Sequence, residues 1–304
     1  MQAVRFHDYG GPEALVLEEV TRPQPEAGQV LVRVIAAGVN PVDWKLRAGY
    51  LKAYWPLQFP STPGQEGAGI IESVGTDVTT FKPGQEVYGI FSAGSYAEYA
   101  LANTDAIQLK PANLSFEEAA SVPMGALTAW ATIEAANIQA GQRVLVHGAA
   151  GGVGLYAVQL AHWKGAHVIA TGSAKNAEYI RSLGVETVLD YNAAPFETLV
   201  SGLDAVIDTV GGDLAERSFK VLRPDGIYIT VAGMLAPDAG KAEGVRAVSV
   251  SRAAPENLAQ VSALLESKEL IPVVGTVFPL AEAHLAQALS ATGHGSGRIL
   301  LTMN

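Results

Sequence analysis

The sequence predicts an α/β protein in two parts, a β-rich part and a parallel sheet with helices on both faces. Its 304 residues are enough for two domains of ordinary size. Up to about residue 120, short alternating strands are separated by Gly and Pro, which is typical of a barrel or sandwich. Beyond that point apolar strands alternate with amphipathic helices, and this alternation predicts a doubly wound parallel sheet.

Local patterns predict the elements of both parts. In the first part we expect strands over 29–37, 67–74 and 85–91 and an extended stretch over 92–103. Ser115 and Glu118 form a capping-box pattern that begins a small helix. In the second part we expect strands over 143–147, 167–171, 188–190, 205–208 and 227–231, and helices over 152–164, 174–183 and 255–268. Strand-like sequence returns from residue 270 and includes 298–302.

Composition excludes several classes of protein. Twenty basic and thirty acidic residues give a net charge of −10, which disfavours nucleic acid and anionic membrane surfaces as partners. The sequence shows no signal peptide and no run of about 18 apolar residues, so we expect a cytoplasmic protein. Cysteine is absent, and no two of the six His stand at metal-binding spacing. Disulfides, thiolate catalysis and a bound metal are therefore not expected.

The most informative segment is a glycine-rich turn at 144–154, Val-Leu-Val-His-Gly-Ala-Ala-Gly-Gly-Val-Gly. It is typical of a buried strand, a tight turn and the start of a helix. In a G-x-G-x-x-G pattern its three positions fall on Ala149, Gly151 and Gly154, and the helix N-terminus would offer N–H groups to phosphates. A tight turn that binds nothing would share this pattern. The complete strand–turn–helix–strand context favours dinucleotide binding through Ala149, Ala150, Gly151, Gly152, Val153 and Gly154.

The residues after the next strand indicate which dinucleotide binds. A site for NAD usually has an acidic residue about 20 residues on, at the ribose 2′-hydroxyl. Here the segment 169–176 contains no carboxylate. Ser173 and Lys175 would instead supply a hydroxyl and a positive charge to the 2′-phosphate of NADP, although Ser173 could simply cap a helix and Lys175 be solvated. The missing acid favours NADP(H) as the cofactor.

Several stretches match a known family, in this order along the chain. They are AAGVNPVDWK at 36–45, PGQEGAG at 63–69, FKPGQEVYG at 81–89, ALTAW at 126–130, the glycine-rich turn, and DTVGG at 208–212. On these motifs the sequence resembles the medium-chain dehydrogenase/reductase superfamily, in its zinc-free quinone oxidoreductase (zeta-crystallin-like) branch.

The resemblance implies a GroES-like β-barrel domain that carries the substrate and a Rossmann doubly wound parallel sheet that binds NADP. We place the GroES-like domain at 1–121, completed by 269–304, and the Rossmann domain at 122–268. The resemblance also implies a homodimer joined through edge strands of the Rossmann domain, with an exposed edge beside residues 227–250.

The motif that carries zinc in related enzymes is altered in this chain. Zinc-dependent relatives hold the metal with a Cys and a His at the positions of Asn40 and Gln65. Glu66 remains, but one carboxylate does not hold zinc, so the resemblance predicts no metal. Without a Lewis acid, reduction of an acceptor that is already electrophilic, a quinone or a conjugated enone, is favoured over alcohol oxidation. Asp43 is expected to organise the Asn40 loop.

Three residues are candidates for catalysis by the same resemblance. Asn40 would lie near the nicotinamide and donate to a developing oxyanion, or else satisfy its own loop. Tyr50 would line the substrate pocket and donate a hydrogen bond or a proton, with Tyr54 and Trp55 as an apolar wall. Thr128 would face the nicotinamide side of the cofactor. Ordinary loop packing is the alternative for Tyr50, Tyr54 and above all Trp55, and a hydrogen bond to its own helix turn is the alternative for Thr128.

Further cofactor contacts are expected where strands end, because ligands collect at the carboxyl edge of open α/β sheets. Tyr191 matches a position beside the adenosine phosphate, and Arg298 matches a basic position that helps the phosphate or caps the sheet. Backbone groups near the ribose, adenine and nicotinamide are expected from Thr209, Val210, Gly211, Ala232, Gly233, Val250 and Ser251. His147 and His167 are expected to be structural, and His294 has no assigned role.

Together these observations predict an NADPH-dependent, zinc-independent oxidoreductase that transfers a hydride to quinones or α,β-unsaturated carbonyls, which are small-molecule substrates. Two alternatives remain within enzymes, an enoyl-thioester reductase and a zinc-free alcohol or aldehyde reductase. A third alternative is a non-catalytic NADPH-binding protein with a structural or regulatory role. Turnover of NADPH with a simple quinone or enone separates this last class from the others.

Overall fold

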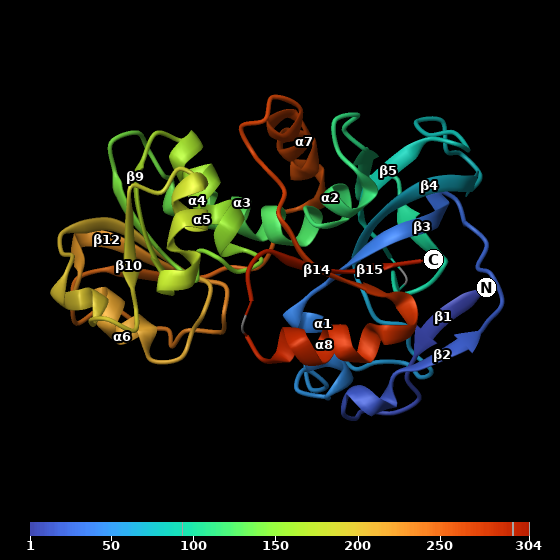
Figure 1. The fold of residues 1–304 in the computed structure, drawn as a ribbon, viewed down its shortest axis with the longest axis horizontal. Coiled ribbons are helices and arrows are strands. Elements are labelled where there is room, and N and C mark those ends of the chain that lie inside the picture. The colour runs from blue at the N-terminus through green and yellow to red at the C-terminus, as the bar shows by residue number, and fades with distance from the viewer. Residues whose placement is uncertain (93, 294, 304) are drawn as a thin grey trace. The chain divides into compact units, whose positions relative to one another are not determined.

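The computed structural model describes residues 1–92, 94–293 and 295–303, so His294 lies outside the described residues. The chain forms two compact units (Figure 1). The first unit combines Met1–Met124 with Ala254–Asn304, and the second is Gly125–Ala253. Among the described residues, no helix has the length and apolar character needed to cross a membrane.

The strands of the first unit form a mixed sheet and a small separate one. The strands are β1 (Gln2–Arg5), β2 (Val16–Glu19), β3 (Gln29–Val39), β4 (Glu66–Val74), β5 (Glu86–Ile90), β6 (Tyr99–Asn103), β7 (Ile107–Leu109), β14 (Val274–Pro279) and β15 (Arg298–Thr302). The larger sheet has the order β14-β15-β3-β4-β5-β7, with β6 also paired to β3, while β1 pairs with β2. All pairs are antiparallel except β14 with β15. This is the predicted GroES-like architecture.

The C-terminal strand completes this unit, as the sequence predicts. β15 runs antiparallel to β3, with Ile299 opposite Val39 and Thr302 opposite Ala36. Leu301 on β15 and Val32 on β3 are fully buried in one core cluster. Residues from two segments far apart in the sequence therefore share one hydrophobic core.

The helices of the first unit are α1 (Pro41–Arg47), α2 (Phe116–Ala120), α7 (Leu258–Glu266) and α8 (Ala283–Ala291). The predicted capping box begins α2: the Glu118 N–H donates to Ser115 Oγ at 3.1 Å, and the Ser115 N–H donates to Glu118 Oε2 at 2.8 Å. The sequence places α7 in the other domain. In the structure, Ser262 on α7 lies 2.6 Å from the Tyr88 hydroxyl, and Asn113 donates to the Leu265 carbonyl at 3.0 Å. These bonds explain why the second segment of the first unit begins at Ala254 rather than at the predicted residue 269.

The second unit contains a six-stranded sheet in which every neighbouring pair is parallel. Its strands are β8 (Arg143–His147), β9 (His167–Gly172), β10 (Thr187–Asp190), β11 (Leu203–Asp208), β12 (Leu222–Thr230) and β13 (Arg246–Ser249). The order β10-β9-β8-β11-β12-β13 is the 3-2-1-4-5-6 order of the Rossmann fold. The predicted fold class is therefore confirmed for both units.

Helices cover both faces of the parallel sheet. They are α4 (Gly154–Trp163), α5 (Ala177–Ser182) and α6 (Leu214–Phe219), and α3 (Pro123–Ala136) leads into the unit. Figure 1 shows α4 and α5 on one face and α6 on the other. The predicted helix over 152–164 begins two residues later than expected, because Gly152 and Val153 still belong to the turn. The predicted helix over 174–183 is a short 3-10 turn at Ala174–Asn176 followed by α5.

Gly154 allows the close approach of α4 to the turn after β8. A Cβ built on Gly154 would lie 2.1 Å from the backbone oxygen of Gly148, a contact that forces the backbone to shift. We expect Gly154→Ala to lower the free energy of unfolding by about 1–3 kcal/mol, as for other overpacked sites. Gly233→Ala is the control, because a Cβ there meets nothing within 4 Å. Urea unfolding of both variants checks this, and equal stabilities would contradict it.

Candidate functional site

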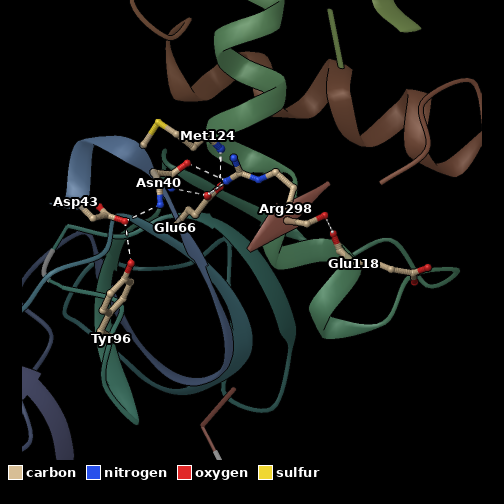
Figure 2. Close-up of polar contacts among 8 residues, drawn as sticks. Asn40, Asp43, Glu66, Tyr96, Glu118, Met124 and Arg298 are labelled. Atoms are coloured by element: carbon tan, nitrogen blue, oxygen red, sulfur yellow. Dashed lines mark hydrogen bonds and ion pairs between the residues drawn. The ribbon is translucent and has the colours of Figure 1, made fainter. Parts of the chain in front are cut away.

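A buried polar cluster lies where three strands of the first unit meet (Figure 2). Asn40 Nδ2 donates to Glu66 Oε1 at 2.7 Å, and Arg298 Nη2 donates to Asn40 Oδ1 at 2.9 Å. Arg298 also forms an ion pair with Glu66 through the same nitrogen. The second carboxylate oxygen of Glu66 accepts the N–H of Met124 at 2.6 Å. Because Met124 lies in the first turn of α3, the helix dipole also favours the Glu66 charge.

Sheet register explains why these residues meet. Asn40 directly follows β3, while Glu66 and Arg298 are the first residues of β4 and β15, the two strands that flank the end of β3. Gly38 leaves the space that the carboxylate needs, because a Cβ there would lie 2.2 Å from Glu66 Oε1. All three polar side chains are at most 3% exposed, so the charges of the ion pair are screened little by water.

Asp43 organises the loop, as the sequence predicts. Its Oδ2 accepts the N–H of Asn40 at 2.8 Å and the hydroxyl of Tyr96 at 2.9 Å (Figure 2). Burial raises the pKa of the Asp43 carboxyl to about 7, although the hydrogen bonds from Asn40 and Tyr96 lower it. Burial also raises the pKa of the Tyr96 phenol well above its usual value, so Tyr96 remains a donor.

The residues at the family's zinc position do not fit a metal ion. A guanidinium already neutralises Glu66, and the Asn40 amide is bonded to both members of the ion pair. Among the described residues, no group of three or more His, Cys, Asp or Glu side chains is arranged to hold a metal. Zinc sites in proteins usually have three or four such ligands.

The position of Arg298 corrects its sequence-based assignment to the cofactor phosphate. Its side chain is 3% exposed and is bonded to Glu66 and Asn40 within the first unit. A guanidinium that is buried against a carboxylate serves mainly to stabilise the charge of that carboxylate, here Glu66, rather than to bind a phosphate. The sequence alternative, a residue that closes the sheet, is nearer to what the structure shows.

The other two catalytic candidates lie in different units. Tyr50 follows α1 in the first unit, is 71% exposed, and packs edge-on against Trp44 at 5.9 Å between ring centroids. Thr128 lies on α3 in the second unit and is half-buried. Trp55 lines a cavity of about 730 Å³ in the first unit, together with Asp43, Leu57 and Gln65. The predicted meeting of Asn40, Tyr50 and Thr128 at one reacting centre stays a prediction.

In open α/β sheets the ligand crevice lies where the strand order reverses. In the second unit the order reverses between β8 and β11, so the turns that follow these two strands are expected to flank such a crevice at the carboxyl edge. In the turn after β8, the N–H groups of Gly152, Val153 and Gly154 have no hydrogen-bond acceptor among the described residues. Ala149 and Ala150 are buried beneath them, and Gly151 is half-buried.

The residues predicted to read the 2′-phosphate directly follow β9. Ser173 is half-buried and precedes the 3-10 turn, but its side chain makes no capping hydrogen bond. The capping alternative for Ser173 is therefore not what the structure shows. Lys175 is exposed and has no ion pair with any residue that the structure describes. Both side chains are free to contact an anion.

The remaining predicted cofactor residues all follow strands of this sheet at its carboxyl edge. Tyr191 follows β10 and is 59% exposed. The others are Thr209, Val210 and Gly211 after β11, Ala232 and Gly233 after β12, and Val250 and Ser251 after β13. Parallel strands bring these eight positions to the same edge as the glycine-rich turn.

Comparison with known proteins agrees with this architecture. Residues 26–112 match the family model of the alcohol dehydrogenase GroES-like domain, and residues 183–301 match that of the zinc-binding dehydrogenase. The chain is 36% identical over 315 residues to 2-methylene-furan-3-one reductase of Solanum lycopersicum, covering 99% of this chain and 79% of that protein. It is 34% identical over 315 residues to the NADPH-dependent alkenal/one oxidoreductase of Arabidopsis thaliana, with the same coverage.

A solved structure gives the same result. The quinone oxidoreductase from Coxiella burnetii superposes with a TM-score of 0.92 at 34% identity, covering 100% of this chain and 99% of that one. The chain belongs to the medium-chain dehydrogenase/reductase superfamily, in its quinone oxidoreductase branch. It is an oxidoreductase of a family that uses nicotinamide cofactors.

Sequence reasoning missed the partners of Glu66 and Asp43. A signal was present, because a Glu at the start of a buried strand needs a cation or several hydrogen-bond donors, and Arg298 also begins a strand of the first unit. Sequence reasoning placed Asp208 in a motif but missed the role of its side chain, and it also missed Tyr228 and the bonds of His147, which lie near the carboxyl edge of the parallel sheet. His147 is 1% exposed and burial lowers its pKa to about 4, so it is a neutral structural residue, as expected.

Asp43 gives the stability of the protein a specific pH dependence. Its folded pKa of about 7 lies above that of an unfolded Asp, about 3.9, so the folded state holds the extra proton between these values. The contribution of Asp43 to stability therefore falls as the pH rises from about 4 to 7. We expect Asp43→Asn, which does not titrate, to gain stability relative to the wild type over this range and to keep a constant difference above it.

Urea unfolding at a series of pH values measures this difference. Asp204→Asn is the control. Burial raises the pKa of Asp204, but hydrogen bonds from the Arg143 N–H and the Arg223 guanidinium outweigh this effect and lower it. Its difference from the wild type should be flat between about pH 5 and 7. A flat difference for Asp43→Asn as well would contradict the assignment.

Proposed function

We propose that this protein is an NADPH-dependent, zinc-independent reductase that transfers a hydride to quinones or α,β-unsaturated carbonyls. The observation that carries the proposal is the pairing of two features. One is a Rossmann sheet whose glycine-rich turn and phosphate-reading positions are unengaged. The other is a zinc position where Arg298 neutralises Glu66. Relatives named for enone and quinone reduction support the substrate class.

The residues of the second unit fit a dinucleotide. The free N–H groups of Gly152, Val153 and Gly154 lie at the N-terminus of α4, where the helix dipole favours a negative charge. Gly151 leaves the backbone open to a pyrophosphate. We assign Ala149 and Ala150 to the same turn. Bound there, the cofactor would supply the hydride, and the protein's own part is to hold it and orient the acceptor.

Specificity for NADP(H) over NAD(H) follows from the residues after β9. No carboxylate stands there to bind a 2′-hydroxyl or to repel a phosphate, while Ser173 offers a hydroxyl and Lys175 a positive charge. We assign the adenosine side of the cofactor to Tyr191 and to Thr209, Val210 and Gly211. Ala232, Gly233, Val250 and Ser251 are assigned to the nicotinamide side through their backbone groups.

The chemical step needs no metal when the acceptor is conjugated. Hydride addition to a quinone or an enone places negative charge on a conjugated oxygen, where a few hydrogen-bond donors suffice. Asn40 donates one amide N–H to Glu66 and keeps a second for the acceptor. We assign the Tyr50 phenol as hydrogen-bond or proton donor, and Thr128 to the nicotinamide. The rest of the rate acceleration would come from holding the nicotinamide and the acceptor in the right geometry for hydride transfer.

The protein is proposed to form a homodimer through the second unit. β13 is the last strand of the parallel sheet, and its backbone edge has no further strand among the described residues. Val248 on this strand is 37% exposed. Edge-to-edge pairing of two β13 strands would satisfy these backbone groups. A monomer mass by light scattering would reject this arrangement.

Lys175 should determine the choice of cofactor. A charge-assisted hydrogen bond is worth about 1.5–3 kcal/mol, so Lys175→Ala should weaken NADPH binding about tenfold or more. NADH binding should hardly change, because NADH lacks the 2′-phosphate. Fluorescence titration with both cofactors measures the two affinities, and Lys164→Ala is the control for removing one Lys charge. Equal affinity of the wild type for NADPH and NADH would refute the assignment.

Turnover tests the function as a whole. We expect NADPH oxidation with simple quinones, enals and enones, unaffected by chelators, and little or none with simple ketones. Tyr50→Phe should lower kcat, by less than the factor of about 10² that the loss of a dominant oxyanion donor costs, and leave NADPH affinity unchanged. Tyr54→Phe is the matched control, because Tyr54 is 90% exposed and is expected only as an apolar wall, which loss of the hydroxyl leaves in place. Activity that is lost with a removable stoichiometric zinc would overturn the proposal.

A further inference from the structure

A buried carboxylate lies directly beneath the proposed cofactor crevice. Asp208, the last residue of β11, is 0% exposed. Its Oδ1 accepts the N–H groups of Val210 at 2.8 Å and Gly211 at 3.0 Å, and its Oδ2 accepts the Tyr228 hydroxyl at 2.5 Å. No Lys or Arg pairs with it among the residues that the structure describes. Neutral donors alone therefore hold this charge.

These bonds fix the turn at 209–211. Two consecutive N–H groups, those of Val210 and Gly211, point at one carboxylate oxygen, and Gly211 adopts φ +83°, a conformation that favours glycine. Val210 is left 58% exposed on this constrained backbone. The constrained backbone therefore presents Val210 at the carboxyl edge of the sheet.

The same turn is fastened to the glycine-rich turn. The Thr209 hydroxyl donates to the backbone oxygen of His147 at 2.8 Å. A Cβ on Gly148 would lie 2.6 Å from Thr209 Oγ1 and 2.8 Å from Val210 Cγ2, so the two turns are in close contact. These are the two turns that flank the crevice where the sheet reverses its order. The position of one turn therefore limits the position of the other.

Tyr228 is the donor that completes the shell of Asp208. It lies on the neighbouring strand β12, opposite Val206, and its ring packs edge-on against Phe219 at 5.3 Å. Burial, followed by the bond to Asp208, raises the pKa of the Tyr228 phenol, so the hydroxyl stays protonated and donates. Asp208 can accept from Tyr228 and from the turn at once because a carboxylate has two acceptor oxygens.

We infer that Asp208 is a positioning residue of the dinucleotide site, which holds the 209–211 turn against the bound cofactor, and that Tyr228 acts through Asp208. The inference rests on the proposed function and adds two residues to the site. Asp208→Asn keeps the shape of the side chain but leaves one acceptor oxygen, which cannot serve both the turn and Tyr228 as the carboxylate does. The turn would then be less ordered before the cofactor arrives, and binding would cost more.

Cofactor titration of the full-length protein tests this inference. We expect Asp208→Asn to weaken NADPH binding about tenfold, and Tyr228→Phe about threefold, as for the loss of one or two hydrogen bonds. The double variant should bind like Asp208→Asn alone, because Tyr228 would have no carboxylate to hold. With a conjugated acceptor, KM for NADPH should rise while kcat at saturating NADPH stays within about twofold.

Asp204→Asn is the matched control on the same strand. Asp204 accepts the backbone N–H of Arg143 at 2.8 Å and bonds to Arg223 at 2.7 Å, at the other end of β11 from the cofactor edge. Its NADPH affinity should remain within about twofold of the wild type, whatever its loss of stability. Thermal unfolding without cofactor shows that each variant is folded before it is titrated.

The outcomes separate this inference from the proposed function. A wild type that binds neither NADPH nor NADH overturns the proposed function and the inference with it. A wild type that binds NADPH, with Asp208→Asn binding as tightly, overturns the inference alone. Additive effects in the double variant would show that Tyr228 does not act through Asp208. If Asp208→Asn fails to fold, unchanged NADPH affinity in Tyr228→Phe overturns the role assigned to Tyr228.

Discussion

The first unit depends on one buried ion pair, between Arg298 and Glu66. It joins the first residues of β15 and β4 across the end of β3, and Asn40 bonds to both charges. Two charges taken out of water are stable only when their hydrogen-bonding groups find partners. Here the Asn40 amide and the Met124 N–H supply those partners for Glu66. The loop that carries Asn40 and Asp43 is positioned as a consequence.

The second unit solves a similar problem without a cation. Asp208 is as buried as Glu66, yet its partners are backbone N–H groups and a phenol. In the first unit a guanidinium fixes the ends of strands, and in the second a carboxylate fixes a turn. Both arrangements place a charged group beneath residues assigned to the reaction, so the candidate surfaces rest on buried polar clusters rather than on apolar packing alone. Such clusters have specific geometry, because a misplaced partner leaves a charge unpaired.

Local patterns in the sequence predicted the fold well where burial is periodic. β8 and β15 were predicted to the residue, and the glycine-rich turn was placed correctly between β8 and α4. α3 was not predicted, and the strand-like sequence expected from residue 270 is right for β14 and β15 but wrong for α8. α3 is apolar on most sides and so shows no helical period, and β14 is largely exposed and so shows no alternation that would set its bounds. The predicted first residue of the second unit, 122, is close to the observed Gly125, but the predicted last residue, 268, lies far beyond the observed Ala253. The reason is that α7 is bonded to Tyr88 and Asn113 of the first unit, which are far away in the sequence.

The candidate site was predictable only in part for the same reason. Residues within one motif, such as Ser173 and Lys175, follow from spacing. The pairing of Glu66 with Arg298 spans 232 residues, and no local pattern encodes it. The assignment of Arg298 to a phosphate rested on a family position and on its charge, and in the fold that charge is buried against Glu66.

The division of the first unit into two segments has a consequence for how the protein is made. A ribosome synthesises Glu66 and then the whole of the second unit before it reaches Arg298. The parallel sheet between Gly125 and Ala253 is continuous in the chain and can fold as it emerges. The N-terminal strands, by contrast, must keep an uncompensated carboxylate and the unpaired edge of β3 until β15 leaves the tunnel. Nascent chains that stop short of β15 would therefore lack both the partner of Glu66 and the strand that covers this edge of β3.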